Sequence, residues 1–169
     1  DWDYVIGSVH FLGKWGFDYL EDWEPGRRNF ASIEEIYAKY YSTVVEMVES
    51  ASELFDIVGH LDLIKKFVVD IPKNATELSF PALDAIAKTN LIVEINSAGW
   101  IKNCREQYPS LGILKAIRER EIPITLNSDA HSTDRVAENF ERSKKLAREV
   151  GFDSIVCLHE KGAREIVKI

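Results

Sequence analysis

The sequence predicts a single α/β domain in which parallel strands are joined by helical crossovers. Short apolar runs alternate with longer amphipathic segments along the whole chain, which is typical of repeated strand–helix units. The 169 residues suit one domain, and no low-complexity stretch or long linker divides them. We therefore expect one domain over residues 1–169.

The first third of the chain predicts a strand, a loop and a long helix. The apolar run at residues 4–9 has the length of a buried strand, and a glycine- and aromatic-rich stretch follows at about residues 11–29, where we expect a loop. Ser32 followed by Glu35 forms a capping box, which marks the start of a helix. Behind it, apolar residues recur at helical spacing as far as Ala51.

The rest of the chain predicts four more strands separated by helices. Pro72 interrupts the mixed segment at residues 65–77, for which we expect no long element. Gly151 ends the last long helix as a C′ glycine. We expect strands at residues 55–59, 91–95, 122–126 and 154–158, helices at about residues 79–89, 110–120 and 134–150, and a short closing helix.

Composition and charge exclude several classes of protein. The chain has 21 Lys and Arg against 28 Asp and Glu, which gives a formal net charge of −7. This acid excess argues against nucleic-acid and membrane-surface partners, because no basic face stands out to meet phosphates. No apolar run approaches the ~20 residues of a membrane span. We expect no secretory leader, because the opening Asp-Trp-Asp-Tyr lacks a basic and then apolar stretch. With only two cysteines, we expect a cytoplasmic protein.

Each of the four histidines stands just after an apolar, strand-like run. His10, His60 and His131 would converge, together with Asp129, because the carboxyl ends of parallel barrel strands meet at one mouth. Imidazole nitrogen and carboxylate oxygen suit Zn, Fe or Mn, so we expect a metal site there. The alternative for any one such histidine is a hydrogen-bonded rim residue. We expect that alternative for His159, which has no acidic partner at short spacing.

Four sequence blocks resemble successive motifs of the polymerase and histidinol phosphatase (PHP) superfamily. They stand in the family's order, each with an apolar strand. Two further segments, Trp15-Gly16-Phe17-Asp18 and Tyr108-Pro109-Ser110, resemble the histidinol-phosphatase branch. The four blocks are YVIGSVHF at residues 4–11, GHLD at 59–62, EINSAG at 94–99 and SDAH at 128–131.

This resemblance implies a distorted β/α barrel related to the TIM barrel, with up to three metal ions (Zn, Fe or Mn) and a phosphomonoester substrate. It implies that His10 and His60 bind one metal of a bridged pair. Asp129 would bind the other metal of that pair, and His131 the third. Asp129 is further implied to assist proton transfer beside a metal-bound hydroxide.

The chain departs from the family pattern at its beginning. No His-x-His motif occurs anywhere, and 169 residues fall short of the ~250 that a β/α barrel typically needs. We therefore expect a partial TIM-like barrel of the PHP type, similar to the C-terminal two-thirds of a histidinol phosphatase with its N-terminal strands missing. Such a chain is expected to bind metal poorly, to be inactive by itself, and to self-associate through its exposed barrel edge.

Basic residues after two of the motifs are candidates for binding the substrate phosphate. The resemblance points to Lys65 or Lys66 after the first of these motifs and to Lys102 after the second. A lysine acts there as a point charge and lacks the bidentate fork of arginine. Arg27 and Arg28, in the loop after His10, are further candidates. For each lysine, a solvated loop position is the alternative.

Three other polar residues complete the predicted site. Charge complementarity suggests that Asp18 meets the ammonium group of the substrate. Glu94 and Asn96 share strand parity, so both would face the barrel interior, with Asn96 near the mouth and able to contact substrate.

Three functions are weighed. The first is hydrolysis of L-histidinol phosphate to L-histidinol and phosphate in histidine biosynthesis, which the motif order favours. The second is another PHP phosphoesterase or an exonuclease-like enzyme, which the net charge of −7 disfavours for long nucleic acids. The third is a non-catalytic interaction fragment, which predicts no activity and less than one metal per chain.

Overall fold

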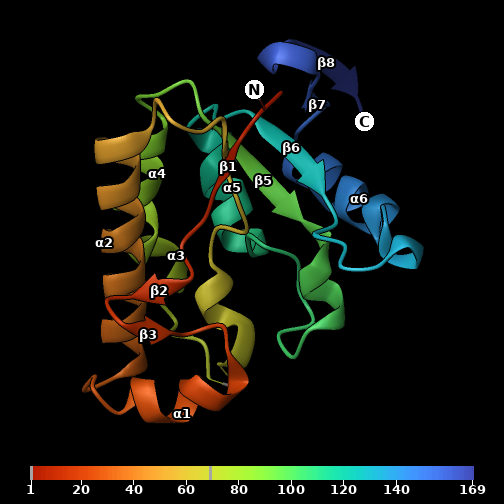
Figure 1. Cartoon of the computed structure of the whole chain (residues 1–169). Coiled ribbons are helices and arrows are strands. Elements are labelled where there is room, and N and C mark those ends of the chain that lie inside the picture. Colours follow the sequence, from red (N-terminus) through yellow and green to blue (C-terminus); the bar gives the residue numbers. More distant parts are fainter. Residues whose placement is uncertain (1, 69) are drawn as a thin grey trace.

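Four parallel strands form the main sheet, and they lie side by side in the order β1-β4-β5-β6 (Figure 1). The computed structural model describes residues 2–68 and 70–169. Each neighbouring pair of strands is parallel, so the predicted crossover topology is confirmed. The strands are β1 (Ile6–Gly7), β4 (Ile57–Val58), β5 (Ile92–Asn96) and β6 (Ile124–Asn127).

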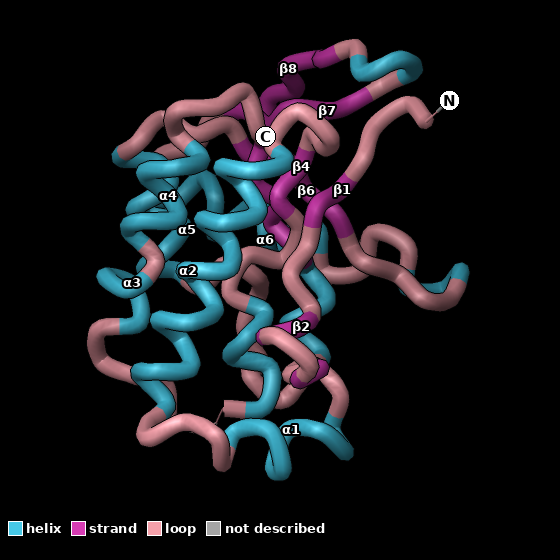
Figure 2. The backbone as a smooth tube through the Cα atoms, turned by 60° about the vertical axis from the view of Figure 1, so that its left-hand side comes forward, coloured by secondary structure: helices cyan, strands magenta, loops and turns pink. Residues whose placement is uncertain are grey.

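A layer of helices follows the order of the strands. In this layer α2 packs against α4, α4 against α5, and α5 against α6 (Figure 2). No helix in the described part of the chain has both the length and the apolar character needed to cross a membrane. The four helices are α2 (Ile33–Ala51), α4 (Phe80–Ile86), α5 (Leu111–Glu119) and α6 (Phe140–Val150), and α3 (Ala75–Leu78) is a shorter neighbour.

The capping box predicted from the sequence starts α2. The Ser32 Oγ atom accepts a hydrogen bond from the backbone N–H of Glu35 at 3.1 Å. The Glu35 carboxylate in turn accepts from the backbone N–H of Ala31 at 2.7 Å, one residue before the expected partner. Both bonds satisfy N–H groups that the helix itself leaves without partners.

The core lies between the helical layer and the sheet. Leu83 and Ile86 of α4, Val93 of β5 and Ile117 of α5 are fully buried there. All five residues of β5 are buried, as is usual for a strand inside a parallel sheet. Burial of side chains of this size contributes roughly 1.5–3 kcal/mol each, which makes this layer the main source of stability.

The expected loop at residues 11–29 contains regular structure, so that prediction was wrong. A short antiparallel hairpin of β2 (Phe11–Leu12) and β3 (Trp15–Gly16) turns at Gly13, and α1 (Leu20–Arg27) follows. The hairpin is held by burial of Trp15 and Phe17 rather than by a periodic apolar pattern. The spacing of apolar residues in the sequence therefore does not predict this hairpin.

The C-terminal part differs from the expectation at two points. The last long helix begins at Phe140 instead of about residue 134, because Ala137 and Asn139 have left-handed backbone angles that interrupt it. It ends at Gly151 as predicted, with φ of 99°. The chain then closes with a strand instead of a helix. That strand, β8 (Arg164–Lys168), pairs antiparallel with β7 (Ser154–Leu158).

The main sheet is open within the described residues, as expected for a partial barrel. Strand β1 lies at its edge, with β4 as the one neighbour in the strand order. The side chains of Tyr4, Val5 and Ile6 along this edge are about 40% exposed. An exposed apolar edge strand is a template for pairing with another chain. Self-association through this edge remains a prediction.

A buried ionic cluster joins the loop after β4 to the loop after β5. The Lys65 ammonium lies 3.0 Å from the Asp62 carboxylate and 2.9 Å from that of Glu106, and it donates to the Gln107 carbonyl at 2.6 Å. Asp62 also accepts from the backbone N–H of Ser110 at 2.9 Å. Burial raises the pKa of Asp62 to about 6, against the opposing charge of Lys65.

The placement of Lys65 in this cluster corrects its predicted role. Its side chain is 2% exposed and all of its close partners are protein oxygens. A lysine held in this way cannot reach a substrate phosphate. It fixes the two loops that carry the polar residues described below.

Replacing Lys65 by methionine tests this cluster. Lys65→Met leaves the Asp62 carboxylate buried without its counter-charge, so we expect the free energy of unfolding to fall by about 3–5 kcal/mol. Urea unfolding followed by circular dichroism measures the change. The matched control is Lys73→Met at an exposed position, with an expected effect within about 0.5 kcal/mol. Equal stability of the two variants would show that the cluster does not hold the loops.

A second pair of variants tests the helical layer. Leu83→Ala removes a fully buried side chain from α4, and we expect a loss of about 2–5 kcal/mol. Leu54→Ala makes the same chemical change at a residue that is 74% exposed, and we expect little effect. The comparison uses the same unfolding measurement, and similar losses at both positions would contradict the described packing.

Candidate functional site

A cleft of about 430 Å³ opens at the carboxyl ends of the parallel strands. The polar residues that follow different strands in the sequence meet here, as the sequence analysis predicts. Of the predicted site residues, those that line the cleft are His10, Asp18, His60, Lys66, Glu94, Asn96, Lys102, Asp129 and His131.

His10 and His60 lie next to each other in the cleft although 50 residues separate them. Their ring centroids are 4.8 Å apart, with the rings edge to face at 80°. His60 is buried, and its Nδ1 atom has no hydrogen-bond partner in the described part of the chain. Burial lowers the pKa of His60, so its imidazole is neutral and carries a free lone pair.

His10 is paired with a carboxylate. Its Nδ1 atom lies 3.1 Å from Oδ2 of Asp18. This hydrogen bond raises the pKa of His10 above its usual value, against the opposing effect of burial. Burial pushes the pKa of Asp18 upward, but the hydrogen bond and charge of His10 outweigh it and hold that pKa below its usual value.

Asp129 and His131 stand on the exposed loop after β6. The Nδ1 atom of His131 lies 2.8 Å from the carbonyl oxygen of Asp129. A carbonyl only accepts, so this bond requires the proton on Nδ1 and leaves the Nε2 lone pair free. The charge of Asp129 adds to the rise in the pKa of His10, and in His60 it opposes the larger lowering of the pKa by burial.

The donors in the cleft suit a divalent metal ion in kind. Zn, Fe and Mn prefer nitrogen and oxygen ligands of the kind found here. The candidates are the unpartnered ring nitrogen of buried His60, the neighbouring imidazole of His10 and the carboxylate of Asp129. Among residues 2–68 and 70–169, however, no three His, Cys, Asp or Glu side chains lie close enough to hold an ion together. The described residues therefore offer ligands of the right kind but no complete set of three around one point.

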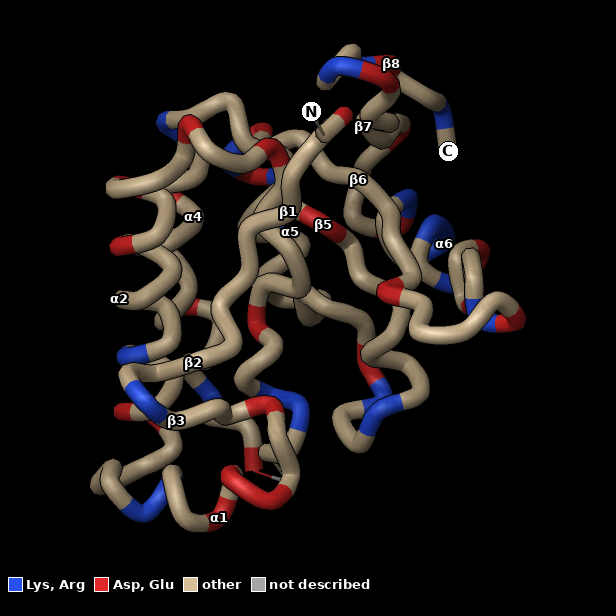
Figure 3. Tube along the Cα trace, viewed as in Figure 1, with Lys and Arg blue, Asp and Glu red and all other residues tan. Residues whose placement is uncertain are grey.

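The carboxylate of Glu94 holds the rim of the cleft together. Its Oε2 atom accepts from the backbone N–H of His60 and from the side-chain amide of Asn96, and its Oε1 atom accepts from the amide of Asn127 at 2.8 Å. In Figure 3, acidic and basic segments are interspersed along the chain. The parity of Glu94 and Asn96 indicated their shared face, but Asn127 was not predicted as a site residue.

Asn96 has a structural role in this rim. Its amide nitrogen donates to Glu94 at 3.0 Å, and its carbonyl oxygen accepts from the backbone N–H of Ala98 at 2.9 Å. The side chain is buried. The expected contact of Asn96 with substrate is therefore replaced by contacts within the protein.

Two lysines provide positive charge at the cleft. Lys66, the alternative to Lys65, lines it together with Lys102. The Lys66 ammonium donates to the backbone carbonyl of Asp18 at 2.7 Å. Burial lowers the pKa of Lys66, and the charge of Lys102 acts in the same direction. Both lysines thus bring positive charge to the same cleft.

The predicted arginines lie elsewhere. The Arg27 guanidinium pairs with the Glu24 carboxylate at 2.9 Å and lines a separate cavity of about 230 Å³ beside Trp23. Arg28 is exposed and does not line the cleft. These positions correct the expectation that either arginine binds phosphate, because neither side chain lines the cleft. The sequence analysis missed Arg135, which lines an adjoining cavity of about 420 Å³.

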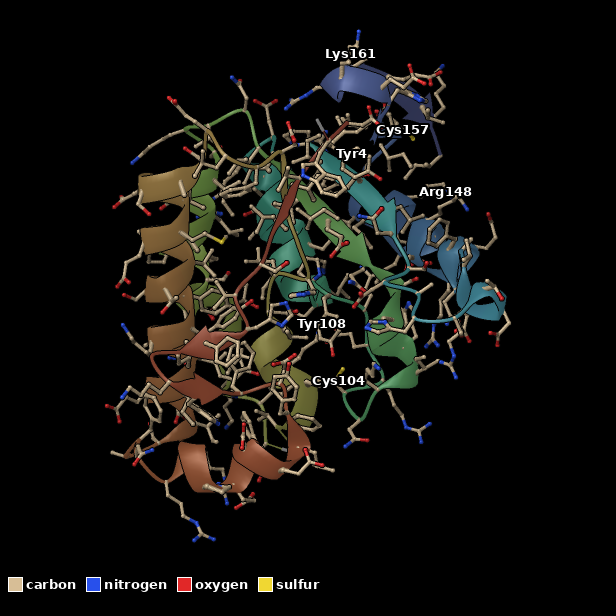
Figure 4. All side chains as sticks on the ribbon, viewed as in Figure 1. Tyr4, Cys104, Tyr108, Arg148, Cys157 and Lys161 are labelled. Carbon is tan, nitrogen blue, oxygen red and sulfur yellow. The ribbon has the colours of Figure 1, made fainter. Side chains whose placement is uncertain are left out.

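Tyr108 forms part of the wall of the cleft. It is buried, and its ring lies 5.1 Å from the Lys65 ammonium. Figure 4 shows Tyr108 beside Cys104 at the carboxyl end of the sheet, with Cys157 at the opposite end. The Cys104 sulfur lies 3.6 Å from the Tyr108 hydroxyl, so this thiol packs behind the cleft.

Comparisons with known proteins agree with the resemblance seen in the sequence. The PHP domain family model matches residues 1–98. A protein of Deinococcus radiodurans named "Probable histidinol-phosphatase" is 40% identical over 164 residues, which cover 95% of this chain and 60% of that protein. A Schizosaccharomyces pombe protein of the same name is 25% identical over 169 residues, covering 95% of this chain and 54% of that protein.

A solved structure shares the fold. It is the crystal structure of histidinol phosphate phosphatase from Lactococcus lactis, complexed with zinc, L-histidinol and phosphate. The TM-score is 0.76 at 23% identity, with 97% of this chain and 62% of that chain covered. The chain thus spans less than two thirds of the length of these relatives. Because the family model matches more than half of its residues, the chain belongs to the PHP domain family.

Proposed function

We propose that this chain carries a large part of the active site of a metal-dependent phosphomonoesterase that hydrolyses L-histidinol phosphate to L-histidinol and phosphate, a step of histidine biosynthesis. The observation that carries the proposal is the meeting of His10, His60, Asp129 and His131 in one cleft beside two lysines. Relatives named as histidinol-phosphatases support the choice of substrate.

The metal-binding part of the proposal assigns four residues. His10 and His60 would hold one cation, because they are adjacent and His60 presents a neutral ring with an unpartnered nitrogen. Asp129 and His131 would contribute from the loop after β6. A divalent cation at this place supplies neutralisation of the phosphoryl oxygens and a hydroxide nucleophile near neutral pH. Zinc is favoured over Fe or Mn, since the Lactococcus protein binds zinc.

The remaining residues would bind and orient the substrate. Lys66 and Lys102 meet the phosphate as point charges from the loops after β4 and β5. Asp129, with its carboxylate partly exposed to the cleft, is positioned to take up a proton during hydrolysis. A cleft of about 430 Å³ is in the size range of sites for small molecules, which favours a small phosphate ester over a nucleic acid.

The first test measures release of inorganic phosphate from L-histidinol phosphate. Asp129→Asn and His131→Ala remove candidate ligands, and we expect each to lower kcat/KM by about 100-fold or more. His159→Ala is the matched control, because His159 is exposed and pairs with Glu165 away from the cleft. The assay is run on this chain and on the full product of its gene.

The outcomes separate the competing functions. Unchanged activity in both Asp129→Asn and His131→Ala would refute the ligand roles. Faster hydrolysis of nucleotides than of L-histidinol phosphate would indicate another phosphoesterase of the family. Absence of activity in the full gene product, with less than one zinc ion per chain, would indicate a non-catalytic module.

The second test follows zinc affinity with pH. The pKa of His10 lies above its usual value of 6.5, so this ring is protonated in mildly acidic solution and loses its lone pair. Burial lowers the pKa of His60, so that ring stays neutral there. We expect zinc affinity to fall about tenfold per pH unit below the pKa of His10. Competition with a chromophoric chelator measures it.

The control for this titration is His10→Ala, which removes the group that titrates. The variant should bind zinc more weakly than the unchanged chain and should lose the steep part of the pH dependence. An affinity for zinc that is constant between about pH 5.5 and about pH 8 in the unchanged chain would contradict the role of His10.

A further inference from the structure

The hairpin after β1 brings Asp18 back to His10. Strand β2 begins directly after His10, and its Phe11 pairs with Gly16 of β3. The hairpin therefore brings the residues after Gly16 close to His10. Asp18 follows two residues later and lies with its Oδ2 atom 3.1 Å from His10 Nδ1. The contact is thus a product of the hairpin, which only the tertiary structure reveals.

The position of Asp18 is fixed on both sides. The preceding residue, Phe17, is fully buried, and its ring packs edge to face on that of Tyr40 at 5.5 Å. The backbone carbonyl of Asp18 accepts from the Lys66 ammonium at 2.7 Å. The Asp18 side chain itself is only 15% exposed. A carboxylate held in this way gives a defined direction to its hydrogen bond with His10.

The partners of Asp18 do not fit its predicted role. Binding of a substrate ammonium group requires a carboxylate oxygen that faces the substrate. Here Oδ2 is taken by His10, and Oδ1 is buried. The carboxylate therefore acts on the histidine.

The hydrogen bond determines where the imidazole proton sits. An ionised carboxylate only accepts hydrogen bonds, so the nitrogen that faces it must carry the proton. In His10 that nitrogen is Nδ1, and the lone pair is left on Nε2. His131 has the same arrangement, with the carbonyl of Asp129 as the acceptor. Carboxylates and carbonyls orient metal-binding histidines in this manner.

We propose that Asp18 is a positioning residue that holds His10 in the tautomer protonated on Nδ1, so that Nε2 is kept free for a divalent cation in the cleft. The role of the free Nε2 atom rests on the proposed metal site. The pairing itself is independent of that proposal, and the two can be tested separately.

The tautomer is measured by nitrogen-15 NMR of the histidine rings in the metal-free chain, at a pH above the pKa of His10. We expect His10 to show a protonated Nδ1 and an unprotonated Nε2. In Asp18→Ala the signal should change to that of a ring protonated mainly on Nε2, because the acceptor is gone. Asp22→Asn, an exposed carboxylate in the same segment, is the control and should leave His10 unchanged.

Zinc affinity provides the second readout. We expect Asp18→Ala to weaken zinc binding about 10- to 100-fold, as removal of such an orienting partner typically does. Asp18→Asn keeps an acceptor oxygen, so its zinc affinity should fall less than that of Asp18→Ala. If Asp18→Ala does not fold, Asp18→Asn and the tautomer of the unchanged chain still decide the question. Asp22→Asn should bind zinc as the unchanged chain does.

Two results would overturn the inference. One is a His10 ring protonated on Nε2 in the unchanged chain. The other is an Asp18→Ala variant with an unaltered tautomer and unaltered zinc affinity. A chain that binds no zinc but shows the Nδ1-protonated ring would count against the proposed metal site, while it would support the pairing of Asp18 with His10.

Discussion

The buried carboxylate of Glu94 connects three strand ends, and the geometry of the cleft depends on it. A charge buried at this depth is costly unless its oxygens are fully hydrogen-bonded. Glu94 meets that requirement with the backbone N–H of His60 and the amides of Asn96 and Asn127. His60 lies just after β4, and Asn96 and Asn127 are the last residues of β5 and β6, so Glu94 ties the carboxyl ends of the three strands together where the cleft opens.

A second ionic network fixes the same loops from behind. Lys65 and Asp62 lie just after His60, and their partners Glu106 and Ser110 belong to the loop after β5. His60 is thus held between Glu94 on one side and this cluster on the other. A ligand side chain needs such support, because a site that is loose by about 1 Å loses much of its affinity.

The three histidines at the cleft keep a ring nitrogen unprotonated by different physical means. In His60 burial disfavours the charged form, which leaves a neutral ring. In His10 and His131 an acceptor next to Nδ1 holds the proton there, a carboxylate in one and a backbone carbonyl in the other. The neighbourhood of each ring therefore determines which nitrogen is free. The chemistry of the cleft depends on these surroundings as much as on the histidines themselves.

The sequence by itself determined the parallel α/β architecture, the start of α2 at Ser32, and the placement of histidines at strand ends, because these follow from local periodicity and capping. Only the tertiary structure decided between Lys65 and Lys66. The partners of Lys65 at Glu106 and Gln107 are about 40 residues away in the chain, and no local pattern reports such a contact. The same reason applies to the hairpin after His10, which depends on aromatic burial, and to Asp18, whose partner is set by that hairpin.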